Sequence, residues 1–374
     1  KKNSRYQQVR RQKMMLAGGG FLILLLVIIF SARSCISSRK AAEAAAIQKA
    51  QEAAQAKKSE ETAKAAQKDP VSLTISVVGD CTLGTDETFD YDASLNAYYD
   101  SNGKDYFFQN VKSIFSADDL TIANFEGTLT DSDTREDKTF AFKAPAEYAQ
   151  ILTSGSIEAV NTANNHSHDY GEQSYTDTLT ALDNAGIIHF GYDDTAVMDI
   201  KGVKVGLVGI YELKDHLGRE QQLKDNIAKV KADGAELVIV IFHWGNESET
   251  VPDTNQMTLG RLAIDEGADL VCGHHPHVLQ GIEYTEDGPI VYSLGDFWFN
   301  DETKYTGLLN LEITSEGLKQ MSFMPCEQKD SQTQYLNNAE SQRALFDHLQ
   351  EISPNITIDD TGVITELKDV DAES

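Results

Sequence analysis

The chain has 374 residues, of which 41% are hydrophobic and 24% charged, a composition typical of a globular protein with a buried core. Its formal net charge is -27 at pH 7. Because an acidic surface repels the phosphate backbone, we expect no nucleic-acid partner. The charge is unevenly distributed: residues 1–13 carry +6 without any acidic residue, so the rest of the chain carries -33.

Residues 14–32 are uncharged and mostly apolar, long enough to cross a hydrocarbon core of about 30 Å as a helix. A cleaved signal peptide is the alternative. Its apolar region is usually about 7–15 residues long and ends at a small-residue cleavage site, which residues 31–34 match poorly. We therefore predict an uncleaved signal anchor and a single-pass protein of the cell membrane. Residues 1–13 would be a basic cytoplasmic tail, and the main domain would be extracytoplasmic.

Residues 33–70 predict a helical stalk. Residues 39–68 consist mainly of Ala, Lys, Glu and Gln, without Gly or Pro. This composition favours a helix, but it provides few large apolar side chains that could bury a face. Pro70 is expected to end the stalk.

From Val71 onward, apolar runs alternate with amphipathic segments. Alternating strands and helices indicate an α/β domain with a parallel or mixed sheet, which we place at residues 71–330. Buried strands are predicted at residues 73–78, 120–123, 203–208, 237–242, 270–272 and 290–294. Helices are predicted at residues 146–153, 173–185, 221–232 and 254–266, each followed by a glycine. Residues 331–374 are expected to form an extension with a helix at 341–352 and an appended hairpin of strands 355–358 and 362–365.

Polar side chains follow four of these strands and a fifth apolar segment, residues 159–163, at the point where each ends. Each short motif could by itself be a turn or a helix cap. Together they are better explained by a metal site, because the carboxyl ends of strands in α/β sheets line the ligand crevice. Carboxylate and imidazole groups suit one or two divalent ions such as Mn, Zn or Fe. The candidate ligands are Asp80, Glu126, Asn165, His243, His275 and His277, with His274 as the alternative to His275.

The sequence Gly-His-His-Pro-His at residues 273–277 is the most specific of these motifs. Imidazoles two residues apart on an extended segment point the same way, and a hydrophobic core does not require that arrangement. His166 and Asp169 lie in the loop that carries Asn165. A hydrogen bond between them would let His166 act as a general acid, or would simply hold the Asn165 loop in place.

As a set, these motifs resemble the CapA/PgsA family of poly-gamma-glutamate capsule biosynthesis proteins, which is similar to the calcineurin-like metallophosphoesterases. The resemblance covers roughly residues 72–326. It implies a metallophosphoesterase-like sandwich of two mixed β-sheets flanked by helices, with a one- or two-metal centre. The motifs that carry it are Gly79-Asp80, Asn124-Phe125-Glu126-Gly127, residues 163–171, His243-Trp244-Gly245, residues 276–280 and residues 292–297.

Two positions depart from the pattern that the resemblance implies. Asp80-Cys81-Thr82 stands where metallophosphoesterases usually have Asp-x-His, so one metal position loses a nitrogen ligand. Asp296 stands where the family usually has asparagine, and we interpret it as a turn residue rather than a contact of the site.

Cys81 and Cys272 follow strands beside the predicted centre and are expected to be close in space. Buried free thiols are the expectation, while a disulfide or a sulfur ligand that replaces the missing histidine are the alternatives.

The sequence leaves two functions open. The resemblance implies a role in poly-gamma-glutamate synthesis or export, with the polymer and other capsule-synthesis subunits as partners. The ligand set equally suits a metal-dependent hydrolase that acts on a phosphoester or an amide of another cell-envelope substrate. A strongly acidic domain repels polyglutamate at long range, but physiological salt screens this repulsion beyond about 8 Å.

Overall fold

The computed structural model describes residue 49 and residues 72–299, 302–314 and 317–367. The predicted cytoplasmic tail and signal anchor, and almost all of the predicted stalk, lie outside the described residues. Within the described part of the chain, no helix has both the length and the apolar character needed to cross a bilayer. Residues 72–299, 302–314 and 317–367 belong to one compact unit, Pro70–Ser374.

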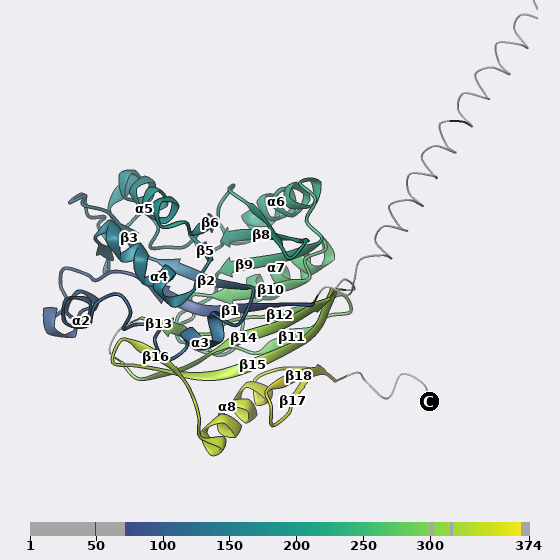
Figure 1. Ribbon diagram of the computed structural model, residues 1–374. Helices are drawn as coiled ribbons and strands as arrows, with labels where there is room; N and C mark the ends of the chain where they lie inside the picture. The colour runs from purple at the N-terminus through teal and green to yellow at the C-terminus, as the bar shows by residue number, and fades with distance from the viewer. Residues whose placement is uncertain (1–48, 50–71, 300–301, 315–316, 368–374) are drawn as a thin grey trace, which may run out of the picture. The chain divides into compact units, whose positions relative to one another are not determined.

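Two mixed sheets form the body of this unit (Figure 1). The larger has ten strands among the described residues, in the order β17 (Ile356–Ile358), β18 (Val363–Glu366), β15 (Gly317–Lys329), β14 (Lys304–Thr314), β1 (Ser72–Thr82), β2 (Leu120–Glu126), β5 (Ala159–Asn161) and β6 (Ile188–Phe190), with β13 (Asp296–Trp298) on β1 and β16 (Gln332–Tyr335) on β15. The smaller has six, in the order β11 (Ile282–Tyr284), β12 (Pro289–Val291), β10 (Leu270–His274), β9 (Leu237–His243), β8 (Val203–Tyr211) and β7 (Ala196–Ile200). A short pair, β3 (Thr128–Leu129) and β4 (Lys143–Ala144), stands apart.

The two sheets pack face to face because alternate side chains of their strands point to opposite faces, and both faces are apolar. Ile239 and Ile241 of β9 share one buried cluster with Ile75 and Val77 of β1. The intervening β9 side chains, such as Val240, instead pack with the helices on the outer face. This arrangement confirms the predicted fold of mixed sheets with flanking helices.

Helices cover the outer faces of both sheets. Beside the larger sheet are α4 (Ala149–Gly155) and α5 (Gly171–Ala185), and beside the smaller are α6 (Glu220–Ala232) and α7 (Thr254–Asp265). All four overlap predicted helices, although the first three residues of the helix predicted at 146–153 form the separate 3-10 helix η2 and α4 continues to Gly155. The shorter helices are α2 (Leu95–Asn102), α3 (Lys112–Phe115), η1 (Tyr91–Ala93), η2 (Ala146–Tyr148) and η3 (His216–Arg219).

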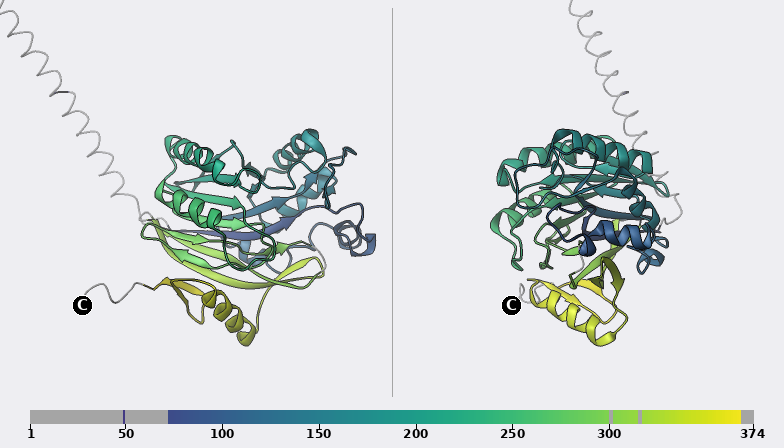
Figure 2. Two further views of the ribbon diagram at one scale, coloured as in Figure 1. Left: turned by 180° about the vertical axis from the view of Figure 1, so that it is seen from behind. Right: turned by 90° about the vertical axis from the view of Figure 1, so that its left-hand side faces the viewer.

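The C-terminal segment is more closely integrated than the expected appended hairpin. The helix α8 (Ala339–Glu351) lies with β17 and β18 on one side of β15, as Figure 2 shows from two further directions. Leu345, Phe346 and Leu349 of α8 join the cluster between the sheets. β18 also pairs with β15, so the hairpin extends the larger sheet instead of standing beside it.

The strands bring their carboxyl ends together at one end of the sandwich. In the larger sheet, Asp80 of β1 is in register with Asn124 of β2 and with Asp296 of β13. In the smaller sheet, His243 of β9 is in register with His274 of β10. Parallel neighbours end at the same edge, so polar residues from both sheets meet there.

Candidate metal centre

Asp80, Glu126 and His243 form the centre of the site. Their side chains are fully buried, and their potential ligand atoms all lie within 4.8 Å of one another. They come from β1, β2 and β9, so both sheets contribute. A buried group of two carboxylates and one imidazole is expensive to maintain without a balancing cation or proton.

Asn124 shows how rich in acceptors this centre is. Its Oδ1 accepts a hydrogen bond from Asn161, so the amide is oriented with Nδ2 toward the site. That nitrogen lies 2.8 Å from Asp80 Oδ1, 3.1 Å from Glu126 Oε1 and 3.2 Å from His243 Nδ1. An amide has only two N–H donors, so three acceptors cannot all be satisfied by it. A bound cation would occupy the acceptor atom that the amide leaves without a donor.

His243 has a defined tautomer in this network. Its Nε2 lies 2.7 Å from Asn165 Oδ1, which can only accept, so Nε2 carries the proton. Nδ1 is then unprotonated and faces Glu126 Oε1 at 3.5 Å. Burial, together with the neighbouring His275, His274 and His277, lowers the pKa of His243 well below its usual value. The neutral ring therefore offers Nδ1 as a ligand atom, and Asn165 orients it.

The pKa of Glu126 also shifts because the centre is buried. Burial and the carboxylate of Asp80 raise its pKa well above the usual value. Two carboxylates this close cannot both stay ionised without a positive charge beside them. The residues present therefore fit a divalent cation.

The side chains of His275 and His277 lie close together, but the backbone conformation that brings them together differs from the predicted one. The prediction places them on an extended segment. In the structure, β10 ends at His274, and His275 and His277 have φ angles of 95° and 58°. Such left-handed backbone is costly for residues other than glycine and concentrates at functional sites. Potential ligand atoms of both histidines lie within 4.8 Å of a carboxylate oxygen of Glu247.

Both His274 and His275 lie beside Asp80, so the alternative between them stays open. His274 is fully buried, with Nδ1 3.5 Å from Asp80 Oδ1, and burial lowers its pKa to about 4. The backbone N–H of His275 donates to Asp80 Oδ2 at 3.1 Å. Burial, together with His277 and His166, lowers the pKa of His275 to about 3. Among the described residues, no protein hydrogen bond reaches His275 Nδ1 or either ring nitrogen of His274. Both rings are therefore neutral, and each has a ring nitrogen without a hydrogen-bond partner among the described residues.

His166 and Asp169 form the predicted pair. His166 Nδ1 and Asp169 Oδ2 are 2.8 Å apart, and both side chains are buried. Although Asp169 favours the protonated ring, burial dominates and lowers the pKa of His166. His166 is therefore expected to be neutral near pH 7, with Nδ1–H donating to Asp169 and Nε2 able to accept a proton.

Lys138 joins this pair and was not anticipated from the sequence. Its Nζ lies 2.7 Å from Asp169 Oδ1 and 2.7 Å from the backbone carbonyl of Asn165. The loop that carries it is anchored by Asp86, which accepts hydrogen bonds from Arg135 and from the backbone of Ala141. A lone lysine in a polar loop carries no sequence signal for such a contact.

Asp296 is not the turn residue expected from the sequence. It is a fully buried residue of β13 beside Asp80. Its oxygens lie 2.6 Å from His277 Nδ1 and 2.6 Å from Lys304 Nζ. Asp80, His277 and Asp296 form a second group whose ligand atoms lie within 4.8 Å of one another. The departure from the family asparagine was the signal that could have identified it.

Two phenylalanine rings form a continuous contact between His166 and His277. Phe142 packs against His166 with ring centroids 4.6 Å apart, and Phe299 packs against His277 at 5.6 Å. Phe142 and Phe299 contact each other at 5.8 Å. This wall keeps one side of the histidine cluster apolar.

The three cysteines of the described residues belong to none of the candidate ligand groups. Cys81, Cys272 and Cys326 are free and buried, as expected. Cys81 packs in the cluster beneath α4 and α5, whereas Cys272 belongs to the cluster between the sheets. The two thiols pack in different clusters because Cys81 alternates to the opposite face of β1 from Asp80. Burial raises the pKa of all three thiols. The charge of Asp80 also contributes to the raised pKa of both Cys81 and Cys272.

Comparison with known proteins identifies the family. The model of the bacterial capsule synthesis protein family PGA_cap matches residues 74–301. The chain belongs to this family. Capsule biosynthesis protein CapA of Bacillus anthracis is 28% identical over 282 residues, which cover 68% of this chain and 67% of that protein. PGA biosynthesis protein CapA of Bacillus subtilis (strain 168) is 29% identical over 283 residues, 68% of this chain and 71% of that protein.

More distant similarities extend to other proteins. A probable polyglutamine synthesis accessory protein of Mycobacterium tuberculosis is 28% identical over 212 residues, 48% of this chain and 56% of that protein. Among solved structures, a hypothetical protein from Thermus thermophilus aligns with a TM-score of 0.44 and 13% identity, covering 68% of this chain and 99% of that one. The sulfate thiohydrolase SoxB of the same organism aligns with a TM-score of 0.39 and 12% identity, covering 70% of this chain and 56% of that one.

Proposed function

We propose that this PGA_cap family chain acts in poly-gamma-glutamate capsule synthesis or export and holds a divalent metal ion in a metallophosphoesterase-like site. Family membership supports the biological role. The observation that carries the metal centre is the buried, acceptor-rich group of Asp80, Glu126 and His243.

The metal would be held by Asp80, Glu126 and His243, with His277 and either His274 or His275 beside them. Carboxylate and imidazole ligands suit Mn, Zn or Fe. When bound, such an ion would supply Lewis acidity toward a phosphoryl or carbonyl oxygen and would lower the pKa of water. Asn165, predicted from the sequence as a ligand, would instead orient His243 through its Oδ1, and His277 would be oriented by Asp296.

The proposed setting is the outer side of the cell membrane. Residues 14–32 would anchor the chain, and the compact unit that begins at Pro70 would face the polymer and the other capsule-synthesis subunits. The length and apolar character of residues 14–32 and the basic residues before them support this proposal.

A second candidate function is metal-dependent hydrolysis of a phosphoester or an amide of another cell-envelope substrate. The His166–Asp169 pair favours it, because Asp169 holds Nδ1 and leaves Nε2 to exchange a proton with a ligand. Turnover of a small phosphoester or of polyglutamate by the metal-loaded chain, with Mn or Zn added, would support this function. A fully loaded protein without turnover would favour the accessory role in polymer synthesis.

The metal content of the purified full chain tests the centre. We expect Glu126→Ala and His277→Ala to lower the metal bound per chain at least severalfold, measured by elemental analysis after dialysis. His189→Ala is a matched control, because His189 pairs with Asp183 away from the site. Equal metal content in all four proteins would disprove the centre.

A further inference from the structure

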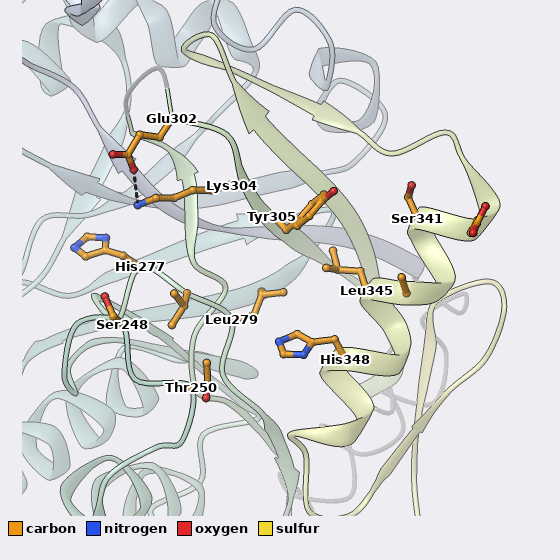
Figure 3. Close-up of a pocket in the computed structure, with 13 residues that line it drawn as sticks. Ser248, Thr250, His277, Leu279, Glu302, Lys304, Tyr305, Ser341, Leu345 and His348 are labelled. Carbon is orange, nitrogen blue, oxygen red and sulfur yellow. Dashed lines mark ion pairs between the residues drawn. The ribbon is translucent and has the colours of Figure 1, made fainter.

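A groove connects the candidate centre to the C-terminal helix. It has a volume of about 920 Å³ and lies between the loops that follow β9 and β10, the start of β14, and one face of α8 (Figure 3). His277 and Lys304 line one end, and His348 of α8 lines the other. The groove is therefore continuous with the candidate centre.

The size and lining of the groove fit a ligand that extends well beyond the candidate metal centre. Ligand sites usually measure about 300–1,000 Å³, and this groove is at the upper end of that range. Leu279, Tyr305 and Leu345 give it apolar surface, while Ser248, Thr250 and Ser341 place hydroxyl groups along it. This combination suits a chain that alternates methylene and amide groups.

The charges of the groove argue against binding through lysine or arginine side chains. Among the described residues that line it, Lys304 is the only lysine or arginine. Its Nζ is 2.6 Å from Asp296 Oδ2 and 3.6 Å from Glu302 Oε2, so its charge is already compensated. Glu302 and Glu340 add negative charge to the lining. Carboxylates of a polyanion would find no uncompensated lysine or arginine among these residues.

We propose that this groove binds several consecutive units of a linear polyamide through their methylene and amide groups, with the carboxylates directed to solvent. The proposal rests on the proposed function, because poly-gamma-glutamate is the polymer to which it applies. The helix α8 then selects the polymer, while the candidate centre engages one unit at the end of the groove.

Filling the groove tests this assignment. Ala344 is exposed on α8 and lines the groove, so Ala344→Trp fills it without disturbing the core. We expect the metal-loaded full chain to bind long poly-gamma-glutamate at least tenfold more tightly than the two-residue γ-linked fragment, and Ala344→Trp to abolish that difference. Binding is measured calorimetrically in detergent.

Glu351→Trp is the matched control, because it introduces the same side chain at an exposed position of α8 outside the groove lining. It should bind the long polymer as the unaltered chain does. Metal content and unfolding temperature verify that both variants fold. If the unaltered chain binds the polymer and Ala344→Trp binds it equally well, the groove assignment is wrong while the proposed function stands. If the metal-loaded, unaltered chain binds no polymer, the proposed function itself fails.

Salt provides a second, independent measurement. Because the groove lacks uncompensated lysine or arginine among its described residues and the whole chain is acidic, affinity should stay constant or rise as salt increases and screens the repulsion. A tenfold fall in affinity between about 50 and 500 mM salt would indicate cation-based binding and would overturn the proposal.

Discussion

The two oxygens of Asp80 face groups from both sheets. Asn124 Nδ2 lies 2.8 Å from one oxygen, and the backbone nitrogen of His275 lies 3.1 Å from the other. The two positions that depart from the pattern expected from the sequence, Thr82 and Asp296, lie on β1 and on its neighbour β13. Thr82, at the position of the missing histidine, directs Oγ1 toward Glu126 Oε2 at 3.4 Å, and Asp296 adds a carboxylate beside His277. Compared with that expected pattern, the group of candidate ligands lacks one imidazole and has one more carboxylate.

The protonation of His277 leads to a prediction at the scale of the residue. Although burial by itself lowers its pKa, the carboxylates of Asp296, Glu126 and Asp80 raise it to about 10. Metal must displace this proton from a ligating imidazole, so metal affinity should increase with pH and level off near pH 10. In Asp296→Asn the pKa of His277 should fall, and the rise in affinity should level off at lower pH.

NMR titration of the metal-free protein measures the pKa of His277, and metal titration over the same pH range measures affinity. His189 serves as the reference imidazole, because it lies away from the site. A His277 resonance that titrates near the ordinary value of about 6.5 in the unaltered chain would contradict this prediction.

At the scale of the element, the C-terminal segment connects the two sheets. β18 pairs with β15 of the larger sheet, and Asn355 bonds to β11 at the edge of the smaller one. The Asn355 side chain accepts from the backbone of Tyr284 at 3.0 Å and donates to its carbonyl at 2.7 Å, as a paired strand would. This contact covers part of an exposed strand edge.

Asn355→Ala removes both of these bonds. We expect the free energy of unfolding to fall by about 1–3 kcal/mol, because a partly buried backbone donor and acceptor lose their partner. Urea unfolding of the full chain measures the loss. The control is Asn102→Ala, an exposed asparagine of α2 whose replacement should change stability by less than about 0.5 kcal/mol. Equal midpoints for both variants would show that the contact with β11 contributes nothing.

At the scale of the whole molecule, the charge distribution and the apolar run predict an anchored protein. The full chain should stay with membranes after a high-salt wash, and a chain that begins at residue 33 should be released into the soluble fraction. Protease added to intact cells should degrade the unit that begins at Pro70. A full chain that a salt wash releases would contradict the anchor, whereas protection from protease would contradict the orientation.

The sequence by itself determined most of the strands and helices of the two sheets and which strand ends carry the candidate ligands. Continuous apolar runs identified β1 and β9, and amphipathic segments followed by a glycine identified α5 and α7, because local packing and helix termination set these patterns. Parallel neighbours end at one edge, so Asp80, Glu126 and His243 could be grouped from the sequence alone. Only the tertiary structure decided the contacts across long loops. Lys138 reaches Asp169 and Lys304 reaches Asp296 through backbone conformations without a periodic signature. The left-handed backbone of His275 and His277, and the groove that α8 closes, also depend on packing between distant segments.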